Sequence, residues 1–365
     1  LREGVKFHSG NELTTADVKF TFDRLKQSQD FKAIFKPFSD INVIDDYTFE
    51  LVTSEPYPLL LNTATYIFPF DSEFYTGQTE DGKDKSAILK HGNSFASENL
   101  SGTGPYTVTE RKQGVRVEFE RFDDYWDTES PGNVGKIVLT PIKENNTRVS
   151  ALLSGGVDFI APVPPNDLER IRNDKNANLV TMSGTRIILF HMNQERVEAF
   201  KNPKVRQAIA YAVNQEGIAA KIMKGFATPA AQMSPEGYQG YNESLTPRFD
   251  VAKAQALMEE AGYADGFSAT MMCPNNRYVN DFKICEAAAA MLAKINVDLQ
   301  LNIMPKSNFW GYIRVPTEQS SFIMSGWDVP AGDAGSMYGA LFYTRDKKEG
   351  YGQVNRGSYS NPELE

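Results

Sequence analysis

Residues 268–304 contain the pattern that most restricts the fold of this chain. Residues 268–273 form a short apolar run typical of a buried strand, and apolar side chains alternate at 297, 299, 301 and 303, as in a second strand. Between them, Asn280 or Asp281 can cap a helix whose apolar side chains recur at helical spacing from 284 to 295. A strand, a helix and a strand in this order predict a parallel pair with a right-handed crossover. The sequence therefore predicts an α/β fold.

The rest of the chain mixes hairpins and further helix–strand segments. Residues 41–54 predict a hairpin that turns at Asp45-Asp46, and Thr14 starts a helix with the spacing of a capping box. Four more strands are predicted at 106–111, 115–121, 136–141 and 157–161. Because domains usually have about 100–200 residues, 365 residues predict two or three domains. We expect a multi-lobed α/β protein.

Charge and composition exclude several classes of protein. The formal net charge is −9, so nucleic acid, whose phosphates repel a negative protein, is not an expected partner. No run of 18 apolar residues occurs, so no segment is expected to span a membrane. The three histidines (His8, His91, His191) and two cysteines lack the spacings of zinc or haem sites. No cofactor or metal is expected.

Motifs of common enzymes are also missing. The chain has neither a phosphate-binding Gly-x-x-x-x-Gly-Lys-Ser/Thr loop nor a Gly-x-Ser-x-Gly turn. Two pairs of adjacent acids, 45–46 and 123–124, could indicate glycosidase chemistry, but neighbouring carboxylates usually diverge or lie in solvated turns. We therefore predict no catalytic residues and keep a hydrolase only as a weaker alternative.

The loop after the strand at 268–273 is the first candidate binding segment. Ligands of open α/β sheets bind where strands end and helices begin. The loop offers two amides, a guanidinium and a phenol at Asn275, Asn276, Arg277 and Tyr278. A guanidinium is suited to a carboxylate, although Arg277 could equally lie in solvent beside the helix caps.

The second candidate segment follows the strand predicted at 321–325. Trp327 could stack on a ligand or belong to the core, and Asp328 or Asp333 could receive an ammonium group or lie in a turn. Arg186, at the start of the strand at 186–193, could pair with an acid of its own lobe or reach a binding cleft.

Cys273 and Cys285 are separated by the step from a strand into a helix. This step can bring the two side chains close enough for a disulfide in an exported protein. Two buried thiols are the alternative, and metal ligation is a remote third.

Six blocks of the sequence resemble the periplasmic solute-binding proteins of family 5, the dipeptide-, oligopeptide- and nickel-binding components of ABC importers. The chain opens with LREGVKFHSG and LTTADV, and the other blocks follow in the order of the family. They are residues 102–106 (GTGPY), 121–126 (RFDDYW), 148–158 (RVSALLSGGVD), 203–213 (PKVRQAIAYAV) and 252–266 (AKAQALMEEAGYADG).

The resemblance implies a two-lobed periplasmic-binding-protein (Venus-flytrap) fold with an extra subdomain in the first lobe. Residues 1–97 are expected to form most of that subdomain, 98–188 the first lobe proper and 189–365 the second lobe. Family members carry a signal peptide and a first strand before the first block, and a return to the first lobe after residues 359–364. The chain is therefore expected to be a large internal portion that lacks both termini.

The resemblance also implies a function and a site. Such a protein is not an enzyme: it captures a small peptide or peptide-like solute between two lobes and delivers it to the permease subunits of an ABC importer. It is expected to be a monomer, either periplasmic or tethered outside the membrane. In peptide-binding relatives an arginine on the loop of Arg277 meets the peptide carboxylate, and an aspartate after the Gly-Trp pair meets the amine. Here that second position is nearest Pro330, between Asp328 and Asp333.

This departure leaves other ligands open, namely an opine, a sugar-like compound or a metal chelate. A sensor that docks a chemoreceptor would keep the same site.

Overall fold

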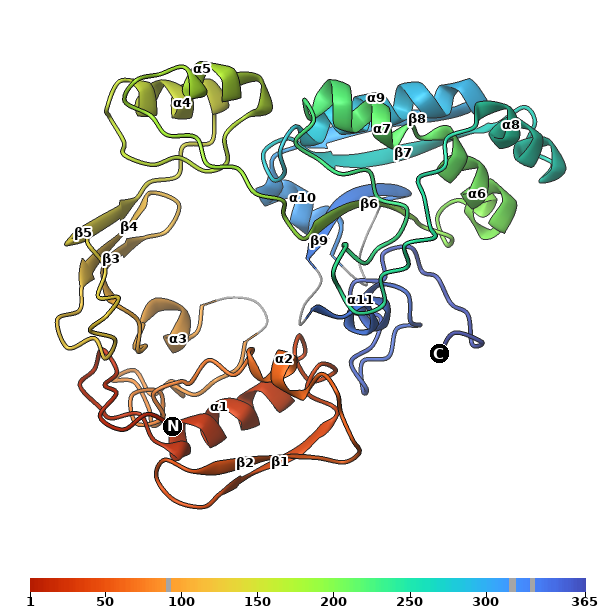
Figure 1. Cartoon of the computed structure of the whole chain (residues 1–365). Helices are drawn as coiled ribbons and strands as arrows, with labels where there is room; N and C mark the ends of the chain where they lie inside the picture. Colours follow the sequence, from red (N-terminus) through yellow and green to blue (C-terminus); the bar gives the residue numbers. More distant parts are fainter. Residues whose placement is uncertain (90–92, 315–319, 329–331) are drawn as a thin grey trace. The chain divides into compact units, whose positions relative to one another are not determined.

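A computed structural model describes residues 1–89, 93–314, 320–328 and 332–365. The contacts divide the chain into two compact units (Figure 1). Unit 1 comprises Leu1–Pro141 and Lys347–Gly350, and unit 2 comprises Ile142–Asp346 and Tyr351–Glu365. The lobe boundaries expected at 97/98 and 188/189 follow the topology of the family. The two units are defined by contacts alone and do not correspond to lobes, so the lobe boundaries stay predictions.

The first part of unit 1 is a helix packed on a hairpin. Helix α1 (Thr15–Gln27) begins where the capping pattern predicts it, and the Thr14 N–H donates to Asp17 Oδ2 at 2.8 Å. Strands β1 (Phe38–Val43) and β2 (Phe49–Thr53) pair antiparallel and confirm the predicted hairpin. A core of five side chains lies between them: Val18, Phe22, Phe35, Phe38 and Ile41.

A buried carboxylate joins distant segments of unit 1. Asp71 has no exposed surface and accepts hydrogen bonds from Ser9 Oγ, Asn11 Nδ2 and Ser101 Oγ, and from the Phe74 N–H. Burial by itself would raise the pKa of Asp71, but these four donors outweigh it and lower the pKa. The turn that holds Ser9 and Asn11 is thereby tied to Ser101, which directly precedes the block at 102–106.

The second part of unit 1 is an antiparallel sheet of β3 (Tyr106–Lys112), β4 (Arg116–Arg121) and β5 (Lys136–Leu139), as predicted. Ion pairs cross it: Glu110 and Glu118 both bind Arg116, and Glu118 also binds Lys136 at 2.6 Å. Two short helices, α2 (Leu60–Ala64) and α3 (Phe95–Glu98), complete the unit.

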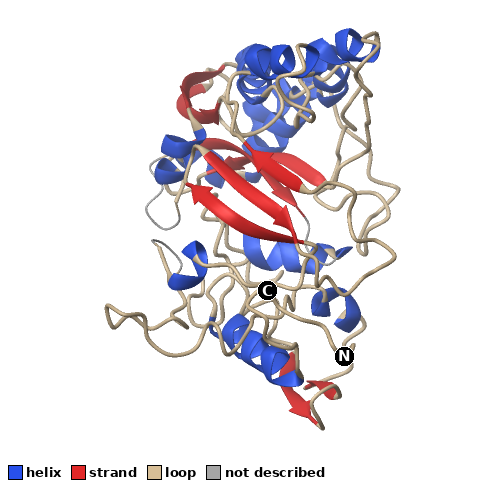
Figure 2. Ribbon diagram, turned by 90° about the vertical axis from the view of Figure 1, so that its left-hand side faces the viewer, coloured by secondary structure: helices blue, strands red, loops and turns tan. Residues whose placement is uncertain are grey.

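Unit 2 is built on a four-stranded sheet of order β6-β9-β7-β8. Figure 2 shows strands in red with helices in blue next to them. The strands are β6 (Arg186–Met192), β7 (Phe267–Pro274), β8 (Val297–Met304) and β9 (Phe322–Asp328). Strand β7 is parallel to β8 and β9, whereas β6 is antiparallel to β9. The predicted strand–helix–strand unit is confirmed as β7, α9 (Asp281–Leu292) and β8.

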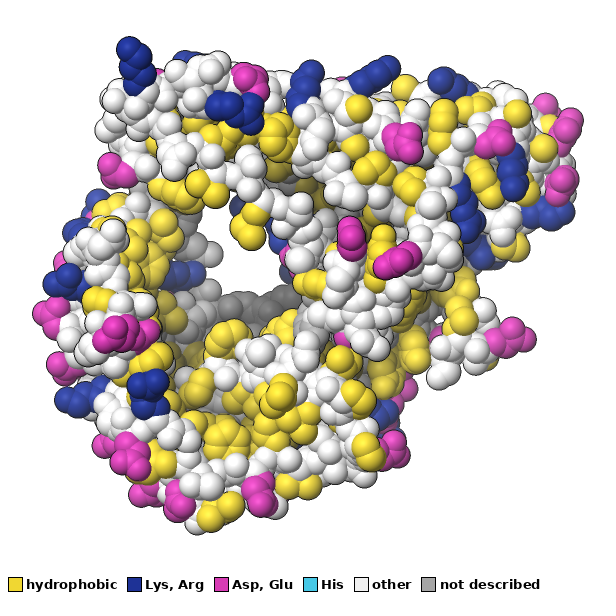
Figure 3. Space-filling model, in the orientation of Figure 1, with side chains coloured by type: hydrophobic (Ala, Val, Ile, Leu, Met, Phe, Trp, Pro, Cys, Tyr) yellow, Lys and Arg dark blue, Asp and Glu magenta, His cyan; other side chains and the backbone are white. Residues whose placement is uncertain are grey.

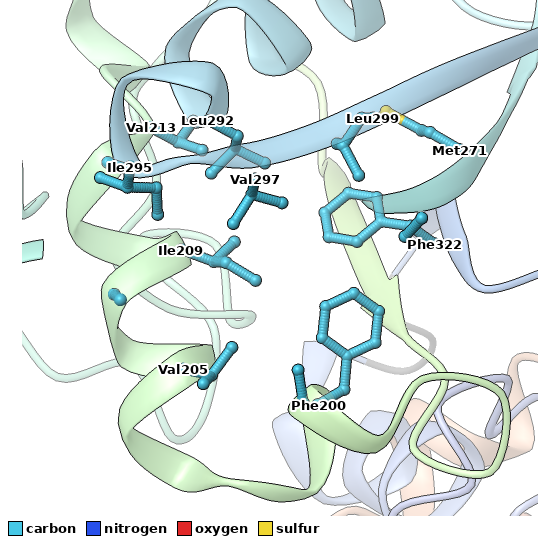
Figure 4. Packing of buried hydrophobic residues seen from close by; sticks show 14 of the residues in the cluster. Phe200, Val205, Ile209, Val213, Met271, Leu292, Ile295, Val297, Leu299 and Phe322 are labelled. Atoms are coloured by element: carbon cyan, nitrogen blue, oxygen red, sulfur yellow. The ribbon is translucent and has the colours of Figure 1, made fainter. Parts of the chain in front are cut away.

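Helices cover both faces of this sheet. Helices α6 (Pro203–Ala212), α8 (Val251–Glu260) and α9 form the core with one face, and Figure 4 shows side chains of α6 pointing at those of β8 and β9. On the other face, Phe309 of α10 (Lys306–Tyr312) packs on β7 and β9. Trp327 packs there against α11 (Ala334–Leu341).

The remaining helices of unit 2 are α4 (Asn145–Leu153), α5 (Leu168–Arg172) and α7 (Gln215–Gly217), the last continued by a π-helical turn at Ile218–Ile222. The strand predicted at 157–161 is wrong: this segment is irregular, because no described strand offers it backbone partners and Pro162 ends it.

Cys273 of β7 and Cys285 of α9 form a disulfide, with their Cα atoms 6.5 Å apart. Both residues are fully buried, so the bond joins sheet and helix inside the core. On the face drawn in Figure 3, acidic and basic side chains are interspersed. Within the described residues, no helix has the length and apolar character that a membrane crossing requires.

Candidate functional site

The carboxyl ends of three parallel strands meet at one edge of the unit 2 sheet. Strands β7, β8 and β9 all end there, and β6 begins there because it is antiparallel to β9. The loop of residues 275–280 joins β7 to α9 at this edge, and α10 follows β8 there. We name it the carboxyl edge. It is the place where open α/β sheets bind ligands.

Arg186 and Asp328 form an ion pair across the carboxyl edge. The two residues are direct partners in the β6–β9 register, and Arg186 Nε donates to Asp328 Oδ2 at 3.0 Å. A second guanidinium nitrogen donates to the same oxygen. The side chains are 41% and 50% exposed, so solvent screens the pair. Arg186 therefore pairs with an acid of the same unit. By the expected lobe boundary at 188/189 the two residues would belong to different lobes, so the pairing within one lobe stays a prediction.

Tyr278 packs over Gly326 beside this pair. A Cβ atom at position 326 would lie 2.8 Å from Tyr278 Cε1 and 2.9 Å from Arg186 Cδ, which real Cβ atoms do not tolerate. Any residue larger than glycine would force the Tyr278 ring or the Arg186 side chain to shift. The Tyr278 hydroxyl is buried and has no hydrogen-bond partner among the described residues.

The backbone of the β7–α9 loop is held by Asp281. Its carboxylate accepts the N–H groups of Arg277 at 2.8 Å and Tyr278 at 3.0 Å. Burial raises the pKa of Asp281, and these backbone donors oppose that effect. Asn280 has a left-handed backbone with φ of 52°, and its Nδ2 donates to the Ile222 carbonyl at 2.8 Å. The Asn280 side chain makes no cap hydrogen bond to α9. Asn280 and Asp281 instead fix the candidate binding loop.

The Arg277 side chain lies between two aromatic rings. Its guanidinium carbon is 4.8 Å from the centre of the Tyr278 ring and 6.0 Å from that of Trp310 on α10. Arg277 forms no ion pair with any residue that the structure describes. Trp310 was not among the predicted site residues. Its place soon after the end of β8, at the next strand–helix connection, was the signal that could have indicated it.

The two asparagines of the loop differ in their roles. Asn276 Oδ1 accepts the N–H of Lys306 at 2.8 Å, which ties the loop to the first residue of α10. The Asn275 N–H donates to the Met304 carbonyl at 3.1 Å, and the residue is exposed. Asn276 therefore supports the loop, while Asn275 presents its side chain at the surface.

Trp327 and Asp333 lie apart from this group. Side chains alternate along β9, so Trp327 is on the face opposite to Gly326, where it packs against α11. Its Nε1 is buried without a partner among the described residues. Asp333 caps α11 by accepting the Ser336 N–H at 3.3 Å. Pro330 lies outside the described residues.

A buried polar group that the sequence analysis also missed lies on the same face as Trp327. His191 Nε2 is 2.8 Å from Ser325 Oγ, and both residues are buried. They are diagonal neighbours on β6 and β9, because His191 is the direct partner of Ile323 and Ser325 that of Leu189. Burial lowers the pKa of His191 well below its ordinary value, and the nearby Arg356 adds to this. Arg356 is itself buried, donates to the Ile313 carbonyl at 3.1 Å and lies 6.0 Å from the Trp310 ring centre.

Among the described residues, no three His, Cys, Asp or Glu side chains come together as ligands of a metal ion would.

Comparison with known families matches residues 1–349 to the bacterial extracellular solute-binding proteins, family 5 Middle. This match covers nearly the whole chain and agrees with the six blocks of the sequence.

Individual relatives agree. The glutathione-binding protein GsiB of Salmonella paratyphi A is 27% identical over 372 residues, which cover 100% of this chain and 69% of GsiB. The solved structure of AgaA from A. tumefaciens R10 with agropinic acid is 25% identical, with a TM-score of 0.79, and the match covers 100% of this chain and 71% of AgaA. The fold is also that of the ABC transporter-associated periplasmic binding protein DppA of Helicobacter pylori, solved with the peptide STSA. That chain is 23% identical with a TM-score of 0.81, and the match covers 100% of this chain and 72% of DppA.

Proposed function

Because this chain belongs to the bacterial extracellular solute-binding proteins of family 5, we propose that it captures a small peptide or peptide-like solute for the permease of an ABC importer. The names of its relatives support this class of ligand: one is a glutathione-binding protein, and another was solved with a peptide. The solute is bound and released unchanged, without catalysis. The protein acts outside the cytoplasmic membrane, in the periplasm or tethered to the cell surface, as a monomer.

The observation that carries this proposal is the placement of Arg277. It lies on a loop held by Asp281, at the carboxyl edge, and pairs with no carboxylate of the described residues. Burying such a charge beneath a ligand is costly unless the ligand supplies the opposite charge. A carboxylate of the solute supplies it, and a guanidinium can bind both of its oxygens.

The other candidate residues contribute shape and selectivity in this proposal. Asn275 offers an exposed amide for hydrogen bonds, and Tyr278 gives an aromatic wall. Asp328 can receive an ammonium group only in competition with Arg186. Trp327 packs against α11 and Asp333 caps it, so a ligand that used either residue would have to compete with these contacts.

In a two-lobed binding protein, the lobes close around the ligand. Closure is driven only by the tighter binding of the ligand to the closed form. The permease then recognises that form.

A non-peptide solute is the second candidate, favoured by the likeness to AgaA, which was solved with agropinic acid. Opines share the carboxylate of a peptide, so both candidates use Arg277 in the same way. A sugar-like compound or a metal chelate stays a weaker alternative, as does a chemoreceptor-linked sensor.

Native mass spectrometry of the protein as purified from cells tests the class of ligand. We expect a small molecule to be released on denaturation, with the mass and fragments of a peptide. An opine mass would replace the peptide by the second candidate. A ligand that is consumed on incubation with the protein would contradict the non-enzymatic proposal and support a hydrolase.

Calorimetric titration of the released molecule tests the role of Arg277. We expect Arg277→Gln to weaken binding about 10- to 100-fold, as for the loss of a charged hydrogen-bonded pair. Arg248→Gln changes an exposed arginine on the loop before α8 and is the matched control, for which no loss is expected. Equal affinities of Arg277→Gln and the wild type would contradict the carboxylate assignment.

A further inference from the structure

Three guanidinium groups and two aromatic rings alternate along the carboxyl edge of unit 2. Arg186 lies 6.0 Å from the centre of the Tyr278 ring, whose other guanidinium neighbour is Arg277 at 4.8 Å. Arg277 in turn lies 6.0 Å from the Trp310 ring, and Arg356 lies 6.0 Å from the same ring. We name these five side chains the arginine–aromatic ladder. Its members come from β6, the β7–α9 loop, α10 and the segment after residue 351.

The ends of the ladder are anchored differently from its centre. Arg186 is paired with Asp328, and the buried Arg356 donates to the Ile313 carbonyl. Arg277 is half-buried in the middle, and its main-chain N–H is held by Asp281. Its guanidinium contacts the faces of two rings instead of a carboxylate. Cation–π contacts fix a guanidinium without neutralising its charge.

We propose that Trp310 is a positioning residue for the binding site. This inference rests on the proposed function. Trp310 and Tyr278 clamp the Arg277 guanidinium in one orientation at the carboxyl edge, so that an incoming carboxylate meets a preorganised cation. Preorganisation lowers the entropy that binding must remove from a long side chain.

The charges of the ladder favour an anionic ligand for the same reason. The guanidiniums of Arg186 and Arg277 lie on the same Tyr278 ring and repel each other, although Asp328 offsets part of the charge of Arg186. A ligand carboxylate at Arg277 relieves this repulsion, while a neutral or cationic group does not. Trp310, which is 38% exposed, forms the side of the clamp that a ligand can approach.

Nuclear magnetic resonance of the whole chain labelled with 15N-arginine tests the clamp directly. The Nε–H signal of Arg277 is assigned from its loss in Arg277→Gln. We expect this signal to be displaced by the ring currents of Trp310 and Tyr278 in the wild type, and to move to the position of a solvent-exposed arginine in Trp310→Leu. Trp310→Phe, which keeps a ring, should retain most of the displacement.

Tyr312→Leu is the matched control for this experiment. Tyr312 lies on the same helix and is 44% exposed, but it is not part of the ladder. Both leucine variants should melt at similar temperatures, and only Trp310→Leu should move the Arg277 signal. An unchanged Arg277 signal in Trp310→Leu would overturn the proposal.

The same samples test the purpose of the clamp. The probes are N-acetyl-L-alanine, a minimal peptide carboxylate, and N-acetyl-L-alaninamide, its uncharged counterpart. We expect only the carboxylate to shift the Arg277 signal, with an affinity about two- to fivefold weaker in Trp310→Leu. If neither probe shifts the wild-type signal, Arg277 does not bind carboxylates and the proposed function fails at this residue. The positioning of Arg277 by Trp310 is judged separately, from the Arg277 signal of the protein without ligand.

Discussion

Gly326 shows how closely the side chains of the carboxyl edge are packed. A methyl group at position 326 would come too close to Tyr278 and Arg186. It would also lie 3.1 Å from Ile188 Cδ1. Glycine at position 326 is therefore a condition for the arginine–aromatic ladder as the structure shows it.

We expect Gly326→Ala to lower the free energy of unfolding by about 1–3 kcal/mol, because overpacking forces Tyr278 and Arg186 to move. Chemical denaturation measures this loss. Gly184→Ala, on an exposed loop where a Cβ meets no atom within 4 Å, is the control and should behave as the wild type. A denaturation midpoint of Gly326→Ala equal to that of Gly184→Ala would show that the contact with Tyr278 is not tight.

At the scale of elements, the polar link between β6 and β9 couples stability to pH. His191 is buried against Ser325, and its pKa in the folded protein is lowered by burial and then by Arg356. The unfolded chain therefore binds a proton at His191 more readily than the folded chain. By linkage, this contribution to stability is present above the ordinary histidine pKa of about 6.5 and is lost as the pH falls below it.

As the pH falls from about 6.5 to about 5, we expect protonation of His191 in the unfolded chain to lower the free energy of unfolding. The expected slope is about 1.4 kcal/mol per pH unit. His191→Gln keeps a polar side chain that does not titrate. The difference between wild type and variant, measured by urea denaturation at several pH values, should diminish with this slope as the pH falls. A difference that stays constant would mean that His191 does not titrate on unfolding.

The disulfide acts between two other elements, β7 and α9. Because it closes a loop between residues 12 apart, it restricts the unfolded chain more than the folded one. We expect the double substitution Cys273→Ala and Cys285→Ala to cost about 3 kcal/mol of unfolding free energy. Thermal denaturation with and without reductant checks this: reductant should destabilise the wild type and leave the double variant unchanged. If the completely reduced wild type melts at the same temperature as the oxidised wild type, the expected stabilisation by the disulfide is contradicted.

At the scale of the whole molecule, the family and the α/β class could be predicted because both are carried by local order in the chain. The strand–helix–strand unit follows from two periodicities, and the six blocks appear in the order of the family. The prediction of a strand at 157–161 was wrong because strand formation is not a local property. A strand needs a partner strand, and the sequence of one segment does not show whether a partner exists.

The place of the candidate binding loop in the fold could be predicted in the same way. The loop at 275–278 was expected to follow a strand, and it does follow β7 at the carboxyl edge, because strand ends align at one edge of a parallel sheet. That it binds a ligand stays a prediction. Which residues meet at this edge could not be predicted. Trp310 joins Arg277 from another connection, and Asp328 meets Arg186 only through the β6–β9 register.

The sequence by itself therefore determined the elements, the family and the loop that carries Arg277, because these depend on neighbours in the chain. Only the tertiary structure decided the partners: the pairing of Asp328 with Arg186, the capping role of Asp333 and the opposite face of Trp327. Side-chain partners depend on strand order, register and the face to which each side chain alternates. These are set by the packing of segments up to 142 residues apart, as for Arg186 and Asp328.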